Sequence, residues 1–327
     1  MKTADQAIHA APKTQGLPAG VTLLSHDGAR FKRNVALTAM LVPLLGFVEA
    51  MRLLATGRFS SVDLWLFGAM YFVQMAGITM GFHRMMAHRG FKTGKVFRAL
   101  LLIAGSMAAE GPLLDWVATH RRHHAYSDRP GDPHSPHVCP AASTSSLRGL
   151  WHAHMPWMLA ADMSSWSHFA RDVLADKQLF FFHRSYVLWI ALGLALPAAI
   201  GAALGGWPGA WSGFIFGGLA RIFVANQFAW CVGSVAHMWG TRPFRTKDQS
   251  ANNWLVAIMT FGEGLQNNHH AFPSSYRHGV TWWEPDLSGW LLALLGTLGI
   301  VWEMREPSAQ DIAQMRVRGN SQTEETT

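Results

Sequence analysis

The chain has 327 residues, of which 50% are hydrophobic and only 14% are charged. An average soluble domain carries about 25% charged residues, so this composition argues against a soluble protein and favours one embedded in a membrane. The formal net charge of +7 arises from Lys and Arg scattered along the sequence. Because there is no basic run and no nucleic-acid motif, nucleic acid is excluded as an expected partner.

Four apolar segments are long enough to cross a bilayer, which takes about 20 residues of helix. They cover approximately residues 34–54, 64–82, 185–204 and 211–236. Residues 1–33 are polar and lack the apolar core of a secretory signal peptide, so we expect a cytosolic N-terminal tail. Residues 304–327 form a polar C-terminal tail. The sequence therefore predicts an all-α integral membrane protein with four transmembrane helices and one domain over residues 34–303.

Two further apolar runs are too short to cross the hydrocarbon core. Residues 99–109 predict a buried or interfacial helix, and residues 287–302 predict an interfacial helix rather than a fifth span. Residues 128–146 are rich in Pro, Asp, Ser and His and predict an irregular loop. The two cysteines, Cys139 and Cys231, lie in unlike surroundings and indicate no disulfide framework.

The positions of the charged residues predict which way the spans run. With the N-terminus inside, the second and fourth spans both return the chain to the cytosolic side. Of the 27 Lys and Arg, only Arg52 and Arg58 lie at outer turns and only Arg221 lies within the fourth span, which leaves 24 on the cytosolic side. A helical cap is therefore expected there. Arg221, Asn226 and Gln227 should face protein or a cavity, because polar groups are costly in lipid.

Histidines gather in three short stretches next to the ends of predicted spans. His120, His123 and His124 have the spacing i, i+3 and i+4, which places their imidazoles on one face of a helix. His83 and His88 are five residues apart, which on a regular α-helix is about 500° and leaves them about 140° apart. We therefore expect the helix to end or bend between them.

The third stretch repeats the spacing of the second, because Gln266, His269 and His270 again stand at i, i+3 and i+4. Neutral imidazole is a suitable ligand for iron, copper, nickel and zinc. Five to eight nitrogen ligands exceed the four that a tetrahedral ion takes. The sequence therefore predicts a histidine-rich site for two metal ions in the cytosolic cap.

The same stretches resemble a known family. The strings HRMMAH, HRRHH and QNNHH, in this order between paired spans, resemble the three histidine boxes of membrane fatty acid desaturases. The longer strings GFHRMMAHRGFK, WVATHRRHHAYSDRPGDPHSP and GEGLQNNHHAFP, and GSVAHMWG at the end of the fourth span, are also similar to their counterparts in that family. The acyl-CoA type is the most similar, and the resemblance covers residues of about 34–302.

This resemblance implies an oxidoreductase with a di-iron centre on the cytosolic side of four spans. Such an enzyme uses O2 as co-substrate to introduce a cis double bond into a fatty acyl chain, with acyl-CoA as the favoured substrate and an acyl-lipid as the alternative. The implied location is a bacterial inner or cell membrane. The resemblance also implies eight histidine ligands, which are His83, His88, His120, His123, His124, His237, His269 and His270.

The electrons for such a reaction must come from another protein. The sequence has no flavin or nicotinamide fingerprint and no cysteine set for an iron–sulfur cluster. We therefore expect a separate ferredoxin, flavodoxin-like protein or haem protein as the electron donor.

Two positions depart from the pattern of the animal acyl-CoA enzymes. The third box there begins with His, whereas Gln266 stands here. The Gln266 amide oxygen can bind iron more weakly than imidazole does, or the amide can orient a neighbouring group, and we include Gln266 among the expected ligands. The second departure is Gly233, where that subfamily carries an Asn four residues before the histidine near the fourth span. Because Gly233 has no side chain, a water bridge of that kind must come from elsewhere or be absent.

Other titratable residues near these stretches are left outside the expected ligand set. Asp and Glu on cytosolic segments are usually solvated or orient a His N–H, and this is our interpretation of Glu110, Asp115 and Glu263. For His152 and His154 a supporting role near the site stays open. A lone His is more often a hydrogen-bonding residue than a ligand. We therefore exclude as metal ligands the histidines without a suitably spaced partner, which are His134, His137, His152, His154, His168 and His183.

Two other functions remain open at this point. A lipid or alkane hydroxylase could use the same scaffold, since such enzymes share histidine boxes and differ in whether the carbon radical loses a second hydrogen or gains OH. A metal-transporting membrane protein is the third interpretation. Transport sites lie near the middle of the membrane, whereas the clustered histidines here lie at or beyond the ends of the predicted spans.

Overall fold

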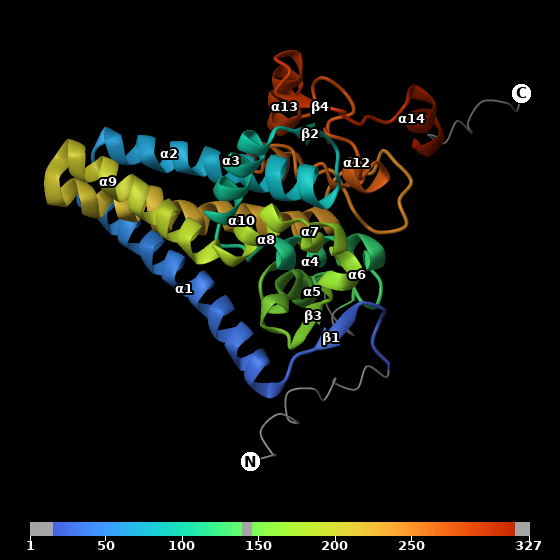
Figure 1. Ribbon diagram of the computed structural model, residues 1–327, viewed down its shortest axis with the longest axis horizontal. Helices are drawn as coiled ribbons and strands as arrows, with labels where there is room; N and C mark the ends of the chain where they lie inside the picture. Colours follow the sequence, from blue (N-terminus) through green and yellow to red (C-terminus); the bar gives the residue numbers. More distant parts are fainter. Residues whose placement is uncertain (1–15, 139–145, 318–327) are drawn as a thin grey trace, which may run out of the picture.

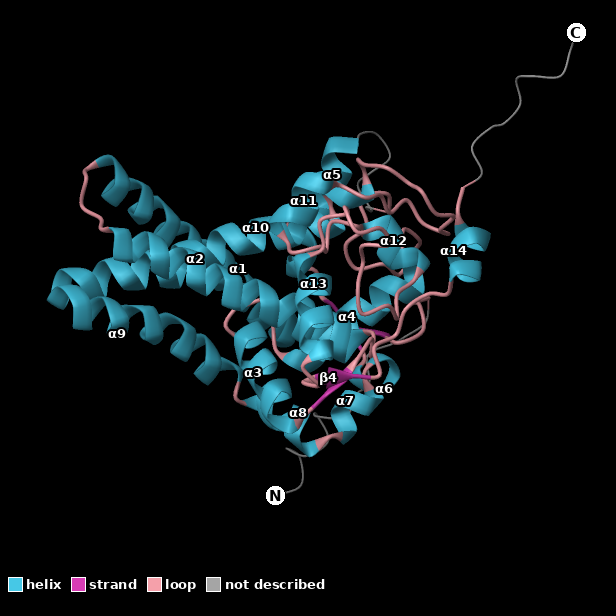
Figure 2. Cartoon of the chain, turned by 90° about the horizontal axis from the view of Figure 1, so that it is seen from above, coloured by secondary structure: helices cyan, strands magenta, loops and turns pink. Residues whose placement is uncertain are grey.

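The computed structural model describes residues 16–138 and 146–317, and the chain in these ranges is mostly helical. The long helices extend to one side of the molecule, and the short helices and loops lie at the other (Figures 1 and 2). The elements in chain order are β1 (Val21–Leu23), α1 (His26–Ala55), α2 (Ser61–Ala76), η1 (Gly77–Ala87), β2 (Lys92–Thr93), α3 (Lys95–Ser106), α4 (Leu113–Tyr126), α5 (Ser146–His154), η2 (Pro156–Leu159), β3 (Asp162–Ser164), α6 (Trp166–Phe169), α7 (Arg171–Ala175), α8 (Lys177–Arg184), α9 (Tyr186–Gly213), η3 (Phe214–Ala220), α10 (Arg221–Gly233), η4 (Val235–His237), α11 (Trp254–Met259), α12 (Gln266–Ala271), α13 (Leu287–Thr297), β4 (Val301–Trp302) and α14 (Ala309–Met315).

Among the described residues, three continuous helices are long and apolar enough to cross a membrane, namely His26–Ala55, Ser61–Ala87 and Tyr186–His237. The first begins earlier than the apolar run, because the Ser25 side chain accepts a hydrogen bond from the backbone N–H of Gly28 and caps α1. The predicted helical membrane architecture is confirmed. The count of four separate helices is not exact.

The third of these helices turns back on itself, which is why three continuous helices stand where four were expected. Gly205 and Gly206 leave the helical conformation, and Gly206 has a φ of 60°, which favours glycine. The two arms then approach closely, because a Cβ placed on Gly201 would lie only 2.0 Å from the backbone oxygen of Gly209. The predicted third and fourth spans are therefore the two arms of one hairpin.

Polar side chains inside the membrane-spanning region face protein, as expected. Arg221 is fully buried, and its guanidinium donates to the side chain of Gln74 at 2.7 Å and to the carbonyl oxygens of Met107 and Gly193 at 2.9 and 3.0 Å. Gln74 in turn donates to the Asn226 side chain at 2.7 Å. Because buried polar groups are costly unless they are hydrogen-bonded, this network fixes how α2, α3, α9 and α10 pack.

The two short apolar runs also form helices of limited length. The run at 99–109 lies in and just after α3, which has 12 residues, and α13 has 11 residues. At 1.5 Å per residue, neither can cross a hydrocarbon core of about 30 Å. Trp290, Leu294 and Leu298 on and beside α13 are exposed, which suits the predicted helix at a membrane interface.

Two small antiparallel sheets tie distant parts of the cap together. Thr22 of β1 stands opposite Met163 of β3, and Lys92 of β2 stands opposite Trp302 of β4. An apolar core joins η1, α3, α4, α8 and α13 and includes the buried side chains of Phe82, Leu102, Leu114, Phe182 and Leu292. This core holds the histidine-bearing helices η1 and α4 side by side at the end of the spans.

Candidate metal centre

His83 and His88 are brought together by a change of helix type. Residues Gly77–Ala87 form a π-helix, and the backbone N–H of His88 donates to the carbonyl of His83 at 3.1 Å. A π-helix joins residues i and i+5, so residues five apart lie nearly above one another. The ring centroids of the two histidines are 4.8 Å apart. The helix ends at Ala87 with His88 as its C-cap, so the expectation that it ends between the two histidines is confirmed, and the wider π-helical turn before that end is the feature that the spacing did not predict.

Helix α4 presents its three histidines as expected from their spacing. Trp116 stacks on the ring of His120 at 5.1 Å between centroids. His120 and His124, one turn apart, point to the same group of rings, whereas His123 points to a neighbouring one. Helix α4 therefore serves two clusters of histidines.

The two arginines between these histidines position α4. The guanidinium of Arg121 donates to the carbonyl oxygens of Met86 and Ala87 at 2.7 and 2.9 Å, directly before His88. Arg122 is buried, donates to the carbonyl of Gly131 at 2.7 Å and forms an ion pair with Asp162 at 2.6 Å. Their hydrogen bonds hold α4 against the end of η1 and against the loop that follows α4.

Five histidines, contributed by η1 and its C-cap, by α4 and by α12, form what we call the first cluster. The Nε2 atoms of His88 and His120 are 2.7 Å apart. The Nε2 atom of His269 lies 3.1 Å from that of His83 and 2.9 Å from that of His124. One nitrogen from each ring lies within 4.8 Å of the others, and the members are His83, His88, His120, His124 and His269.

Three histidines, His123, His237 and His270, form the second cluster. The Nε2 atoms of His237 and His270 are buried and have no hydrogen-bond partner among the described residues. Each of the neighbouring pairs His123–His124 and His269–His270 contributes one ring to the first cluster and the other ring to the second. The two clusters are therefore adjacent. The structure thus brings together in two groups all eight histidines that the resemblance implies.

Each histidine of the second cluster is held by a carboxylate that the sequence analysis did not select. The Nδ1–H groups of His123 and His237 donate to Asp132 and Asp128, both at 3.0 Å. His270 donates to Asp248 at 2.6 Å. A carboxylate on one ring nitrogen fixes the tautomer and turns the other nitrogen toward a metal. The available signal was the pair of Asp residues four apart just after the second histidine stretch.

The first cluster has one such carboxylate. His83 Nδ1 forms an ion pair with Glu263, and Glu263 also pairs with the buried Arg84 at 3.2 Å. Glu263 therefore orients a His N–H. Glu110 accepts a hydrogen bond from the Trp116 indole at 3.1 Å, and Asp115 accepts one from the Trp166 indole at 2.7 Å. Neither carboxylate belongs to a group of possible metal ligands among the described residues.

Burial favours the neutral, metal-binding form of five of the eight imidazoles, whereas for His123 burial lowers the pKa but Asp132 and two further aspartates outweigh it, so its net pKa shift is upward. Burial, reinforced by the other histidines of the centre, lowers the pKa of His88, His120, His124 and His269 well below the ordinary value. Burial also lowers the pKa of His270, to about 4, although Asp248 opposes this shift. These five rings are therefore neutral near pH 7, as metal ligation requires.

Gln266 lies on the same short helix as His269 and His270. Its residue is 3% exposed, and its Oε1 is buried without a hydrogen-bond partner among the described residues. Helix α12 repeats the spacing i, i+3 and i+4, so the Gln266 side chain shares a face with the two histidines. An unpaired buried amide oxygen is costly, and a metal ion would satisfy it.

Two histidines outside the expected ligand set border the clusters. His278, which the sequence analysis did not select, is 2% exposed, and its ring centroid lies 4.4 Å from that of His269. His134, which was excluded as a ligand, stacks on His123 at 4.3 Å. A Cβ on Gly233 would lie 2.7 Å from His134 Nδ1, so His134 occupies the space that a side chain at position 233 would need.

The remaining excluded histidines divide into two kinds. His137 donates to the backbone carbonyl of His237 at 2.8 Å, and His154 contacts Ser234 and Gln227 at 3.1 Å each. They therefore support η4 and α10 near the second cluster. His152, His168 and His183 belong to none of the possible metal groups among residues 16–138 and 146–317. Cys139, for which no disulfide with Cys231 is expected, lies outside the described residues.

The donor set fits a pair of transition-metal ions. The second cluster offers unpartnered Nε2 atoms, and a carboxylate accepts a hydrogen bond from the Nδ1 atom of each ring. Metal-ligating histidines usually have this arrangement. Neutral nitrogen ligands suit iron, copper, nickel and zinc, and the carboxylate and carbonyl oxygens preferred by magnesium and calcium are absent from both clusters.

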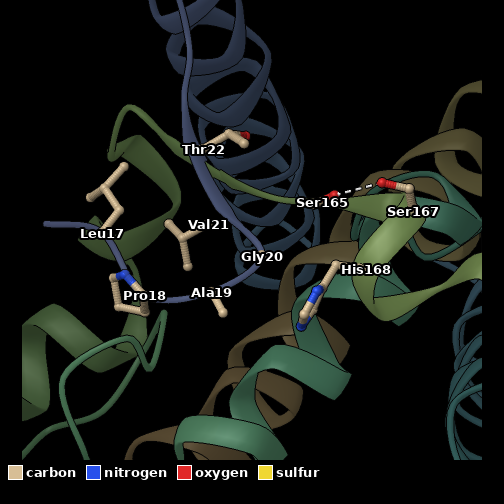
Figure 3. A pocket seen from close by; sticks show the side chains of 9 residues that line it. All are labelled: Leu17, Pro18, Ala19, Gly20, Val21, Thr22, Ser165, Ser167 and His168. Atoms are coloured by element: carbon tan, nitrogen blue, oxygen red, sulfur yellow. Dashed lines mark hydrogen bonds between the residues drawn. The ribbon is translucent and has the colours of Figure 1, made fainter. Parts of the chain in front are cut away.

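A surface cavity lies elsewhere and is a poor candidate for this centre. It has a volume of about 480 Å³ beside β1 and α6, and Figure 3 shows the His168 ring and the hydrogen bond between Ser165 and Ser167 at its edge. Its lining contains no Asp, Glu, Lys or Arg and no histidine of either cluster. We therefore assign it no part in the chemistry.

Removing one of the supporting carboxylates should weaken the centre without destroying the fold. Asp248→Ala leaves His270 Nδ1 without its acceptor, so the ring can rotate or change tautomer. We expect metal affinity and activity each to fall by roughly 10- to 100-fold. Metal titration of the purified protein measures the affinity, and product analysis measures the activity. Asp311→Ala, at the exposed start of α14, is the control and should change neither. Equal metal affinity in Asp248→Ala and the unaltered protein would contradict this role.

Comparison with known proteins gives consistent matches. The profile of a family described as fatty acid desaturase matches residues 61–286. A hex-5-enoyl-[acyl-carrier protein] acetylenase of Moorena producens is 43% identical over 274 residues, covering 83% of this chain and 85% of that protein. An acyl-CoA C20 Δ5-desaturase of Anemone leveillei is 35% identical over 81% of this chain and 80% of its own length. An sn-1 stearoyl-lipid 9-desaturase of Anabaena variabilis is 36% identical over 68% of this chain and 76% of its own length.

Proposed function

The chain belongs to the fatty acid desaturase family, and we propose that it uses O2 and a di-iron centre to introduce a cis double bond into a fatty acyl chain. The observation that carries the proposal is the pair of adjacent histidine clusters, in each of which one nitrogen of every ring lies within 4.8 Å of the others. Soluble di-iron proteins use carboxylates for this purpose, whereas the two clusters here consist of histidines, and Glu263 and Asp132 each belong to a neighbouring group of possible ligands.

The first cluster would hold one iron and the second cluster, with Gln266, the other. When bound, the two irons supply the redox chemistry that activates O2 and removes two hydrogens from the acyl chain. Asp128, Asp132 and Asp248 keep the second-cluster rings in one tautomer. Glu263 does the same for His83 of the first cluster.

The reaction needs two electrons from outside the chain. Forming one double bond removes two hydrogens from the substrate, while reduction of O2 to two water molecules takes up four electrons and four protons. The substrate supplies half of each, so two electrons and two protons remain to be supplied. The protons come from solvent and the electrons from a separate carrier protein.

Acyl-CoA is the substrate carrier that we propose, and the relatives define the alternatives to test. Their names include an acyl-carrier-protein substrate, acyl-CoA and a stearoyl-lipid. The purified protein should be given a matched acyl chain on each of the three carriers, with electron donor and O2, and the products analysed by mass spectrometry. A new double bond supports the proposal. A hydroxylated product would favour the hydroxylase, and no product on any carrier would contradict both.

The orientation in the membrane is also a proposal, with the metal centre in the cytosol. A reporter inserted between Gly206 and Trp207, in the turn of the α9 hairpin, should report the outer face. Reporters after Met1 and after Thr327 should both report the cytosol, because an even number of crossings separates them. A reporter at residue 206 that faces the cytosol would show that the hairpin does not cross.

A further inference from the structure

Four cations gather where two distant segments of the cap meet. The backbone N–H of Arg245 donates to the carbonyl of Met315, and that of Val317 donates to the carbonyl of Pro243, both at 2.8 Å. These hydrogen bonds place residues 315–317 alongside residues 243–245. All four side chains belong to exposed residues, and we call them the basic patch, which consists of Arg242, Arg245, Lys247 and Arg316.

The charge of the basic patch is not neutralised by its surroundings. No member forms an ion pair with a carboxylate within residues 16–138 and 146–317; Arg316 lies over the ring of Phe244 instead, 5.6 Å from its centroid. Arg242 donates to the Gln249 side chain at 2.6 Å and to the backbone oxygen of Asp248. The Asp248 carboxylate is 8% exposed and points inward. The outer face of this loop is therefore positive.

The same loop connects directly to the second cluster. Asp248, the neighbour of Lys247, accepts the Nδ1–H of His270 at 2.6 Å. The backbone N–H of Gln249 donates at 2.7 Å to Asp128, which holds His237. Lys247 and Gln249 are exposed and Asp248 between them is buried, so one residue separates solvent from the ligand network.

We propose that the basic patch is the docking surface for a small acidic one-electron carrier protein that reduces the metal centre. This rests on the proposed function, which needs two electrons per double bond. The carrier is oxidised in two successive encounters, each delivering one electron to the centre. Complementary charge accelerates such encounters and orients the partner.

An anionic head group of the substrate carrier is the other molecule that could bind this charge. The geometry favours the electron carrier, because the patch adjoins the Nδ1 side of His270, which the carboxylate covers. The acyl chain must instead reach the side where the unpartnered Nε2 atoms of His237 and His270 converge. An electron carrier that docks on the Nδ1 side of these rings leaves their Nε2 side free for the acyl chain.

The test is the double variant Arg245→Glu/Lys247→Glu in the full chain, in bilayer discs. Binding of a plant-type [2Fe–2S] ferredoxin and of a flavodoxin is measured at low salt, together with the KM for each carrier. We expect binding of at least one carrier to weaken, and its KM to rise, by at least about 10-fold, with a smaller dependence on salt. Product from a single turnover with photoreduced 5-deazariboflavin, a neutral small reductant, should stay within about twofold of the unaltered protein.

Lys95→Glu/Lys177→Glu is the matched control, since both lysines are exposed, carry no ion pair and give the same change of net charge. Unchanged binding of both carriers in the patch variant would overturn the proposal, and so would an equal loss of binding in the control. It would also be overturned if the patch variant raised the KM for acyl-CoA or acyl-carrier protein and left the KM for the electron carriers unchanged. If the proposed function itself is wrong, neither reductant yields product, whereas carrier binding still reports on the patch.

Discussion

His124→Ala abolishes product formation while leaving the protein folded. His124 contributes a ring to the first cluster, 2.9 Å from His269 between their Nε2 atoms, and it stands at the centre of the three histidine stretches. Removing one imidazole opens a coordination position and leaves a void that water can enter. We expect iron to fall from about two to about one per chain and product to drop below detection.

The measurement is metal analysis and product analysis of one purified sample. His168→Ala is the control, because His168 is exposed and lies at the surface cavity rather than in a cluster. It should retain both metal and activity. If His124→Ala forms product with its full iron content, the assignment of the first cluster is wrong.

Gln266→Ala should selectively deplete the iron of the second cluster and abolish turnover. The Gln266 amide oxygen is buried without a partner among the described residues, and the second cluster offers three imidazoles where the first offers five. A neutral amide oxygen is a weaker ligand than imidazole, so the iron held by the second cluster should be bound less tightly.

The alternative role for Gln266 gives a different result. If its amide only orients a neighbouring group or a water molecule, Gln266→Ala keeps both irons and slows the reaction by roughly 10- to 100-fold. Gln266→His adds a second comparison, because a position shaped for a ligand should bind iron at least as tightly with imidazole. Two irons per chain in Gln266→Ala would show that Gln266 is not a ligand.

The spacing of the histidines predicted which residues form the centre better than it predicted the backbone conformation that presents them. The spacing of His120, His123 and His124 predicts a shared helical face, and α4 has this form. The pair His83 and His88 violates the α-helical period, which suggested a break. The chain does end the helix at Ala87, but the turn before that end is π-helical, which the spacing did not show. This turn packs against α3 and α4, so contacts with other elements accompany the wider helix.

The supporting carboxylates were harder to anticipate for a related reason. Asp248 lies 22 residues before His270, and Asp128 lies 109 residues before His237. Such partners become neighbours only when the loops fold over the cap. His278 was missed because it has no histidine at helical spacing, and it meets His269 only through the turn after α12.

The central claim is that the two histidine clusters hold two irons that desaturate an acyl chain. The most direct test is to measure iron per chain and double bonds formed on the same purified sample, supplied with acyl substrate, electron donor and O2. We predict about two irons per chain, and product that scales with iron content and is absent from zinc-loaded protein. A sample that forms a double bond with one iron or none per chain would contradict the claim.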